Sequence, residues 1–140
     1  MKFLLANEKV TPPKETGTGF LHIAPYFVAG QRLQSWNAWN KPQDIISKTT
    51  QNSPTYHIPP EQRVSIPCGF VVDDIPEGHC LEVEVIEEAV MTQGLHCPVR
   101  SRFFNGDEVY INFHNISDSL SQVKAGQMIA IAKLVHIIPL

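Results

Sequence analysis

The sequence has no long hydrophobic run, no surplus of positive charge and no Gly-rich phosphate loop. A membrane helix needs about 20 consecutive apolar residues, and the longest apolar runs here are far shorter, so we expect no membrane span. The apolar start, residues 1–6, is too short for a secretory signal peptide. The formal net charge of −3 excludes the basic surface of duplex-binding domains. We therefore expect no sequence-specific nucleic-acid partner.

Cysteine is also scarce. Cys68, Cys80 and Cys97 are an odd number without the spacing of a disulfide framework, so we expect free thiols in a reducing compartment. Cys80 and Cys97 each follow a histidine, His79 and His96. Adjacent residues on a strand point to opposite faces, so neither pair alone can chelate one ion. A zinc site would require the two pairs to meet, and we predict no metal and no cofactor.

No motif for catalysis is evident. The GxxxxGK[ST] and GxGxxG motifs are missing, and no local signature marks a nucleophilic serine or cysteine. Two doublets of identical acids occur, Asp73-Asp74 and Glu87-Glu88. Paired carboxylates can bind Mg²⁺ or act as general acid and base. A solvated turn explains the first doublet, whereas the second lies where a strand ends and keeps the catalytic interpretation open.

What the sequence does contain is alternation of apolar and polar residues, which predicts strands with one buried face. Residues 64–66, 81–85 and 109–113 follow this pattern, whereas residues 128–135 are apolar on both faces apart from one lysine. Eleven prolines and eight glycines are scattered and divide the chain into short segments. These features favour a single all-β domain over the whole chain, a sandwich, jelly roll or barrel. The residues predicted to be buried are Leu81, Val83, Val85, Val109, Ile111, Phe113, Ile129 and Ile131.

Residues 31–60 interrupt the alternation. They are rich in Gln, Asn, Ser, Thr and Pro and have little periodicity, so we predict a long polar insertion without regular structure. Trp36 and Trp39 stand out in it, because two indoles three residues apart would share one side of a helical turn. Two interpretations are open. The indoles seal the edge of the core, or they form a contact patch for a partner, since aromatic residues are enriched at interfaces.

Three further segments have local predictions. Residues 2–6 are predicted to form an edge strand. Pro67 and Gly69 predict a kink or bulge at the end of the strand that begins at residue 64. Residues 101–107 are predicted to be a hairpin turn with aromatic flanks.

Several segments, taken in order, resemble the dUTPase/dCTP-deaminase superfamily. They are IPCGF at residues 66–70, IPEGH at 75–79, GL at 94–95, NIS at 115–117 and GQMIA at 126–130. The resemblance covers about residues 64–138. It implies a distorted β-barrel or jelly roll that forms homotrimers, with active sites shared between subunits.

The catalytic residues that this resemblance implies are replaced. The phosphate-binding PRSGLA segment falls on residues 85–90, where Glu87 and Glu88 would repel a triphosphate. The deaminase catalytic glutamate falls on Asn112, which cannot act as a base.

The dUTPase motifs with acidic residues are altered too. The catalytic Asp and the stacking Tyr fall within residues 99–107, which offer Ser101, Phe103 and Phe104 instead. The Gly-Tyr-Asp-Leu motif falls on residues 19–22 and lacks its Asp, and no Gly-rich C-terminal arm precedes residue 140. The resemblance therefore implies a retained scaffold without the chemistry.

We accordingly expect a non-enzymatic trimeric module. Phages and other viruses carry relatives of dUTPase, and a trimer suits three-fold positions on a capsid or tail. The expected role is a virion protein, such as a capsid-decorating, cement or tail protein, or a viral adaptor that binds a viral or host protein, in the virion or the host cytoplasm. The alternative is a divergent dNTP-binding protein or nucleotidohydrolase that recruits Asp73, Asp74, Glu87 or Glu88 to a metal.

The trimer interface is predicted on the last strand. Met128, Ala130, Ala132 and Leu134 give residues 128–136 a second apolar face. An exposed apolar strand invites edge-to-edge aggregation, so a neighbouring subunit is expected to cover it. The alternative is that both faces are covered within one chain, by the N-terminal segment and residues 31–60.

Overall fold

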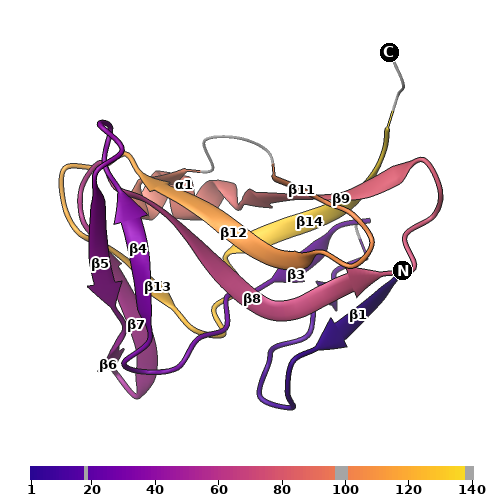
Figure 1. The fold of residues 1–140 in the computed structure, drawn as a ribbon, viewed down its shortest axis with the longest axis horizontal. Helices are drawn as coiled ribbons and strands as arrows, with labels where there is room; N and C mark the ends of the chain where they lie inside the picture. The colour runs from indigo at the N-terminus through magenta and orange to yellow at the C-terminus, as the bar shows by residue number, and fades with distance from the viewer. Residues whose placement is uncertain (18, 97–100, 138–140) are drawn as a thin grey trace.

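The computed structural model describes residues 1–17, 19–96 and 101–137. These residues form β-strands and one short helix (Figure 1), so the all-β prediction is confirmed. The elements are β1 (Lys2–Leu5), β2 (Lys14–Glu15), β3 (Leu21–Ile23), β4 (Arg32–Trp36), β5 (Pro42–Ile46), β6 (Lys48–Thr50), β7 (Ser53–Ile58), β8 (Arg63–Asp73), β9 (His79–Val85), α1 (Glu87–Gln93), β10 (Leu95–His96), β11 (Ser101–Phe103), β12 (Glu108–Asn115), β13 (Ser121–Lys124) and β14 (Ala130–His136).

The strands form three antiparallel sheets. A six-stranded sheet has the order β10-β12-β8-β4-β5, with β1 paired to β8; a five-stranded sheet has the order β11-β9-β14-β3-β2; and a three-stranded sheet has the order β13-β7-β6. Figure 1 shows β8 and β12 as long curved strands that cross the middle of the molecule. No helix in the described part of the chain is long and apolar enough to span a membrane.

Alternate side chains of β8 and β12 fill the core, as period two requires. Seven of the eight residues predicted to be buried are buried, and the exception is Ile131, which is half-buried. On β14 the small side chains of Ala130 and Ala132 point into the core. Ile131 lies on the opposite face, beside Glu84 of β9 and His22 of β3.

The predicted irregularity at Pro67 and Gly69 is present, but it lies within β8, which continues to Asp73, and not at a strand end. The register shifts between Glu108 and Tyr110, which pair with Val71 and Pro67, so three residues of β8 lie opposite one residue of β12. Gly69 has a φ of +78° within this irregularity, a conformation that favours glycine. A Cβ atom there would also approach the Val10 side chain to 2.8 Å.

Residues 31–60 form regular structure, so the prediction of a long irregular loop is wrong. They contain β4, β5, β6 and β7. Polar residues such as Ser35 and Thr55 occupy fully buried positions on these strands, and this hides the alternation that usually marks a strand. Whether the segment is an insertion relative to other proteins stays a prediction.

Of two local predictions, one is confirmed and one is wrong. The strand at residues 2–6 is present as β1, and β8 is its partner. The turn after β11 is present, but it is not a hairpin turn, because β11 pairs with β9 and β12 pairs with β8 and β10. The turn instead passes the chain from one sheet to another. Asn105 fixes it there, because its Oδ1 accepts a hydrogen bond of 2.7 Å from the Ile75 backbone N–H.

Candidate functional site

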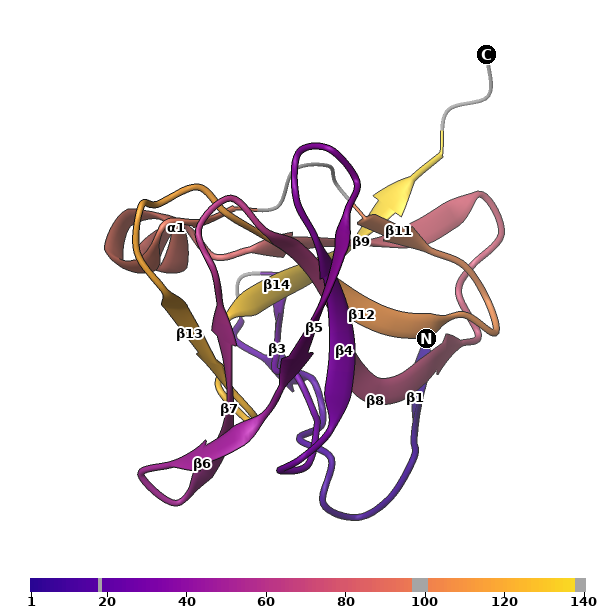
Figure 2. The same cartoon turned by 60° about the vertical axis from the view of Figure 1, so that its left-hand side comes forward.

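The two tryptophans lie on a β-hairpin made by β4 and β5, whose turn stands at the top of the view in Figure 2. Trp36 ends β4 and is 39% exposed, whereas Trp39 lies in the turn and is 77% exposed. The predicted helical turn is therefore wrong, and neither indole seals the core. The contact-patch interpretation stays a prediction.

Side-chain amides hold this hairpin in shape. The Oδ1 atom of Asn37 accepts hydrogen bonds from the backbone N–H groups of Trp39 and Lys41, at 2.9 and 3.0 Å. Arg63 of β8 then ties the hairpin to the sheet, because its Nη2 donates to the Asn37 carbonyl at 3.2 Å and to Asn40 Oδ1 at 2.7 Å. The hairpin is thus fixed before any partner arrives.

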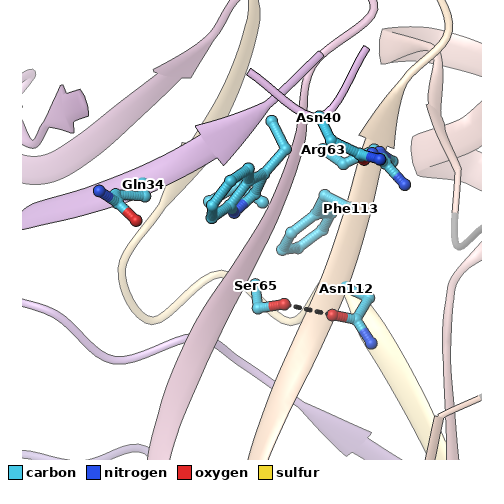
Figure 3. Close-up of a pocket in the computed structure, with 8 residues that line it drawn as sticks. Gln34, Asn40, Arg63, Ser65, Asn112 and Phe113 are labelled. Atoms are coloured by element: carbon cyan, nitrogen blue, oxygen red, sulfur yellow. Dashed lines mark hydrogen bonds between the residues drawn. The ribbon is translucent and has the colours of Figure 1, made fainter. Parts of the chain in front are cut away.

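A groove of about 430 Å³ lies between the hairpin and strands β8 and β12 (Figure 3). Small-molecule sites are commonly about 300–1,000 Å³, so the groove is large enough for one. In Figure 3, Asn40 and Arg63 lie together at one end, and Ser65 and Asn112 lie below them. The groove is lined by Gln34, Trp36, Asn40, Arg63, Val64, Ser65, Asn112 and Phe113.

Asn112 joins three strands through its side-chain amide. Ser65 Oγ of β8 donates a hydrogen bond to Asn112 Oδ1, and Asn112 Nδ2 donates to Ser101 Oγ of β11 at 2.7 Å. Both ends of the amide are therefore used in holding β8, β12 and β11 together. This is the position at which the family resemblance implies a catalytic glutamate, and a neutral amide held in this way cannot accept a proton from water.

Basic side chains lie in one row across three strands beside the groove. His96 of β10 pairs with His114 of β12, which pairs with Arg63 of β8. Burial lowers the pKa of His114 most, and the charges of Arg63 and His96 lower it further, against a smaller opposing effect of Glu61. His114 is therefore neutral at pH 7.

The other expected catalytic positions are dispersed. Glu87 and Glu88 are exposed in the first turn of α1. Ser101 is bound to Asn112, Phe103 is buried and Phe104 is exposed. In the part of the chain that the structure describes, His, Cys, Asp and Glu nowhere gather in a group of three or more that could hold a metal ion.

Of the two histidine–cysteine pairs, the structure describes His79, Cys80 and His96. His79 contacts His136 across β9 and β14, with ring centroids 4.9 Å apart, and Cys97 lies outside the described residues. Cys68 and Cys80 are free, buried thiols, as predicted. Burial is the main cause that raises the pKa of both thiols, so neither is a reactive thiolate at neutral pH.

The predicted trimer-interface residues differ in exposure. Ala130 and Ala132 are fully buried in the chain's own core, whereas Met128 is half-buried and Leu134 is 39% exposed. The proposal that both alanines belong to a face left for a neighbour is therefore wrong, because the chain already covers them. The trimer itself concerns further copies of the chain and stays a prediction.

Sequence reasoning missed the groove. Period two could have placed Arg63 and Ser65 on one outer face of β8, but the hairpin that forms the opposite wall was not predicted. Which side chains lie opposite each other on neighbouring strands depends on the pairing register. A shift of one residue in the register moves every side chain of a strand to the other face of the sheet.

Solved structures of phage and bacterial dUTPases share the fold of this chain over nearly its whole length. No protein-family model and no curated protein matches the sequence. Among solved structures, the dUTPase of Staphylococcus bacteriophage 80alpha is similar with a TM-score of 0.68 and 12% identity, covering 99% of this chain and 91% of that chain. The dUTPase of Streptococcus mutans gives 0.63 and 14%, covering 100% and 98%. A point mutant of the dUTPase from phage phi11 of S. aureus gives 0.64 and 13%, covering 99% and 92%. The described chain therefore has a dUTPase-like fold.

Proposed function

We propose that this chain is a non-enzymatic interaction module built on a dUTPase-like fold. It acts as a homotrimer, either as a virion protein that decorates or cements a capsid or belongs to a tail, or as a viral adaptor. The observation that carries the proposal is the state of Asn112, whose amide is bound at both ends by Ser65 and Ser101. The position where the resemblance implies a base holds a structural link between strands.

Electrostatics supports the same conclusion. A nucleoside triphosphate needs cations and N–H donors around its phosphates. The segment at the place where the resemblance puts the phosphate-binding motif instead begins α1 with exposed Glu87 and Glu88, and no basic residue lies in the last turn of that helix. Two carboxylates at this point would repel a polyanion.

A dUTPase fold with a regulatory role has a precedent among the similar structures. The phage dUTPases that include the bacteriophage 80alpha protein are described as controlling transfer of virulence genes by a proto-oncogenic G protein-like mechanism. That description belongs to those proteins. It supports the proposal by giving a case in which the fold serves control of another process.

We propose the tip of the β4–β5 hairpin as the contact for the partner. Trp39 is 77% exposed there, and large aromatic side chains are frequent anchors of protein interfaces. The hydrogen bonds of Asn37 and Arg63 fix the hairpin, which reduces the entropy lost on binding.

The first test is an assay of pyrophosphate release from each dNTP with Mg²⁺, together with an assay of dCTP deamination. We expect no turnover. A rate of about 1 s⁻¹ or more, ordinary for an enzyme, would refute the proposal and favour the alternative, a divergent nucleotidohydrolase.

The second test separates the two proposed roles. If the chain is a virion protein, mass spectrometry of purified virus particles encoded by the same genome should detect it as a stoichiometric component. If the particles lack it, co-purification from infected cells should recover a partner with the native protein and lose it with Trp39→Ala. Leu4→Ala, which also removes an exposed apolar side chain, is the matched control and should keep the partner. Absence from the particles together with absence of any partner contradicts the interaction role.

A further inference from the structure

The groove under the hairpin is lined mostly by polar side chains. Its lining contains three side-chain amides (Gln34, Asn40 and Asn112), one hydroxyl (Ser65), one guanidinium (Arg63) and one indole (Trp36). None of its lining residues is a carboxylic acid. An amide both donates and accepts hydrogen bonds, as does a hydroxyl, and this mixture suits a ligand that carries many hydroxyl groups.

The polar groups are fixed in advance. Arg63 donates hydrogen bonds to the Asn37 carbonyl and to Asn40 Oδ1. Both bonds come from one nitrogen, Nη2, and a guanidinium has five N–H donors in all. Asn112 is held by Ser65 and Ser101. Binding therefore costs little side-chain entropy.

Trp36 and Arg63 are cross-strand partners in the sheet. Trp36 of β4 and Arg63 of β8 are paired across the two strands, and the Cβ atoms of such pairs lie about 4.5–5.5 Å apart. The two side chains therefore share one face of the sheet and line the same groove, so one small ligand can contact both. A ring that carries its own carboxylate makes both contacts with a single unit.

We propose that this groove binds an acidic saccharide, whose carboxylate-bearing pyranose ring stacks on Trp36 and directs its carboxylate to Arg63. The C–H face of a pyranose packs on an aromatic ring, and a guanidinium pairs with a carboxylate in a forked geometry. Gln34, Asn40 and Ser65 supply hydrogen bonds to the hydroxyl groups. His96 and His114 lie in the same cross-strand row as Arg63, so the row contributes no negative charge.

The test uses fluorescence of a Trp39→Phe variant, which leaves Trp36 as the single tryptophan of the two in the chain. The probes are two matched pairs: 3′-sialyllactose against lactose, and a hyaluronan tetrasaccharide against chitotetraose. At least one acidic saccharide should change the Trp36 emission and bind about tenfold more tightly than its neutral counterpart. dUMP and dCMP serve as competing probes and should bind more weakly.

Variants locate the site, with calorimetry as the readout and circular dichroism as the check of folding. Arg63→Gln should abolish the preference for the acidic probe, whereas Arg32→Gln, which changes an exposed arginine paired with Asp44, should keep it. Trp36→Ala should abolish binding, and Trp39→Ala should leave it unchanged. If Arg63→Gln fails to fold, Gln34→Ala tests the same groove at an exposed position and should weaken binding several-fold.

Three results overturn this proposal. They are failure of both acidic probes to bind below about 10 mM, equal affinity for the neutral counterparts, and tighter binding of dUMP or dCMP. These results are distinct from failure of the proposed function, because that function concerns the Trp39 tip and is read from particles and co-purified proteins.

Discussion

The Asn115 side chain gives a prediction of stability that can be worked out bond by bond. Asn115 is fully buried at the end of β12. Its Nδ2 donates to the carbonyls of Ile58 and Ser119, both at 2.8 Å. Its Oδ1 accepts from the backbone N–H and the Oγ of Ser117, at 3.0 and 2.7 Å. One amide thus fixes the loop after β12 and joins it to β7.

Asn115→Ala removes these four hydrogen bonds. At about 0.5–1.5 kcal/mol each, the free energy of unfolding should fall by about 2–6 kcal/mol. Urea unfolding followed by far-UV circular dichroism, at one fixed protein concentration, measures the change. Ser117→Ala, which removes the Oγ bonds to Asn115 and to the carbonyl and N–H of Ser119, should cost less, and the double variant should show coupling.

The control is Ser119→Ala. The backbone of Ser119 makes its hydrogen bonds to Asn115 and Ser117, and its side chain is exposed, so stability should change by no more than about 0.5 kcal/mol. A loss below about 1 kcal/mol for Asn115→Ala would refute the reasoning, because the four bonds would then contribute almost nothing.

Three further predictions follow from burial and charge. Phe113→Ala should lower the free energy of unfolding by about 3–5 kcal/mol in urea, because the ring is fully buried; a loss under about 1 kcal/mol would contradict its place in the core. The pKa of His114 is lowered in the folded chain, so the unfolded chain binds its proton first, and stability should fall as the pH drops below about 6.5. His114→Gln should flatten this part of the stability curve, and an unchanged curve would exclude His114 as the cause. Light scattering should detect a homotrimer, and Leu134→Asp, at an exposed position of β14, should weaken it without unfolding the protomer; a native chain that stays monomeric at micromolar concentration would rule the trimer out.

The strands with clear alternation were predictable from the sequence. Val109, Ile111 and Phe113 are apolar in a run whose other members are polar, and burial of this face is the only arrangement that hides them from water. The same reasoning located the kink at Pro67 and Gly69, because proline removes a ladder donor and glycine permits positive φ.

The prediction of buried residues failed where the sequence pattern did not indicate which face of a strand is buried. Residues 128–135 are apolar on both faces, so alternation could not decide whether Ala130 or Ile131 points inward. In the structure, Ala130 and Ala132 are the buried residues. On β4 and β7, Ser35 and Thr55 occupy the buried positions because the structure supplies them with hydrogen bonds, and the polar sequence then resembled a loop.

The candidate site was less predictable still. Trp36 and Trp39 were singled out by their residue type, but their different surroundings depend on the hairpin. The groove exists because Trp36 is paired with Arg63, which is distant from it in sequence. Such pairs depend on strand register, and register is fixed by the whole sheet.

The place of β14 in its sheet has a consequence for how the chain is made. β14 follows β2, β3, β9 and β11 in the sequence, yet it lies in the middle of their sheet, between β9 and β3. During synthesis, β3 and β9 therefore emerge with no strand between them and with open edges. Folding of this sheet must wait for residues 130–136, and its dependence on distant pairings makes it slow. Over that interval the nascent chain is open to association with other chains, so the step that closes the sheet also ends its exposure to aggregation.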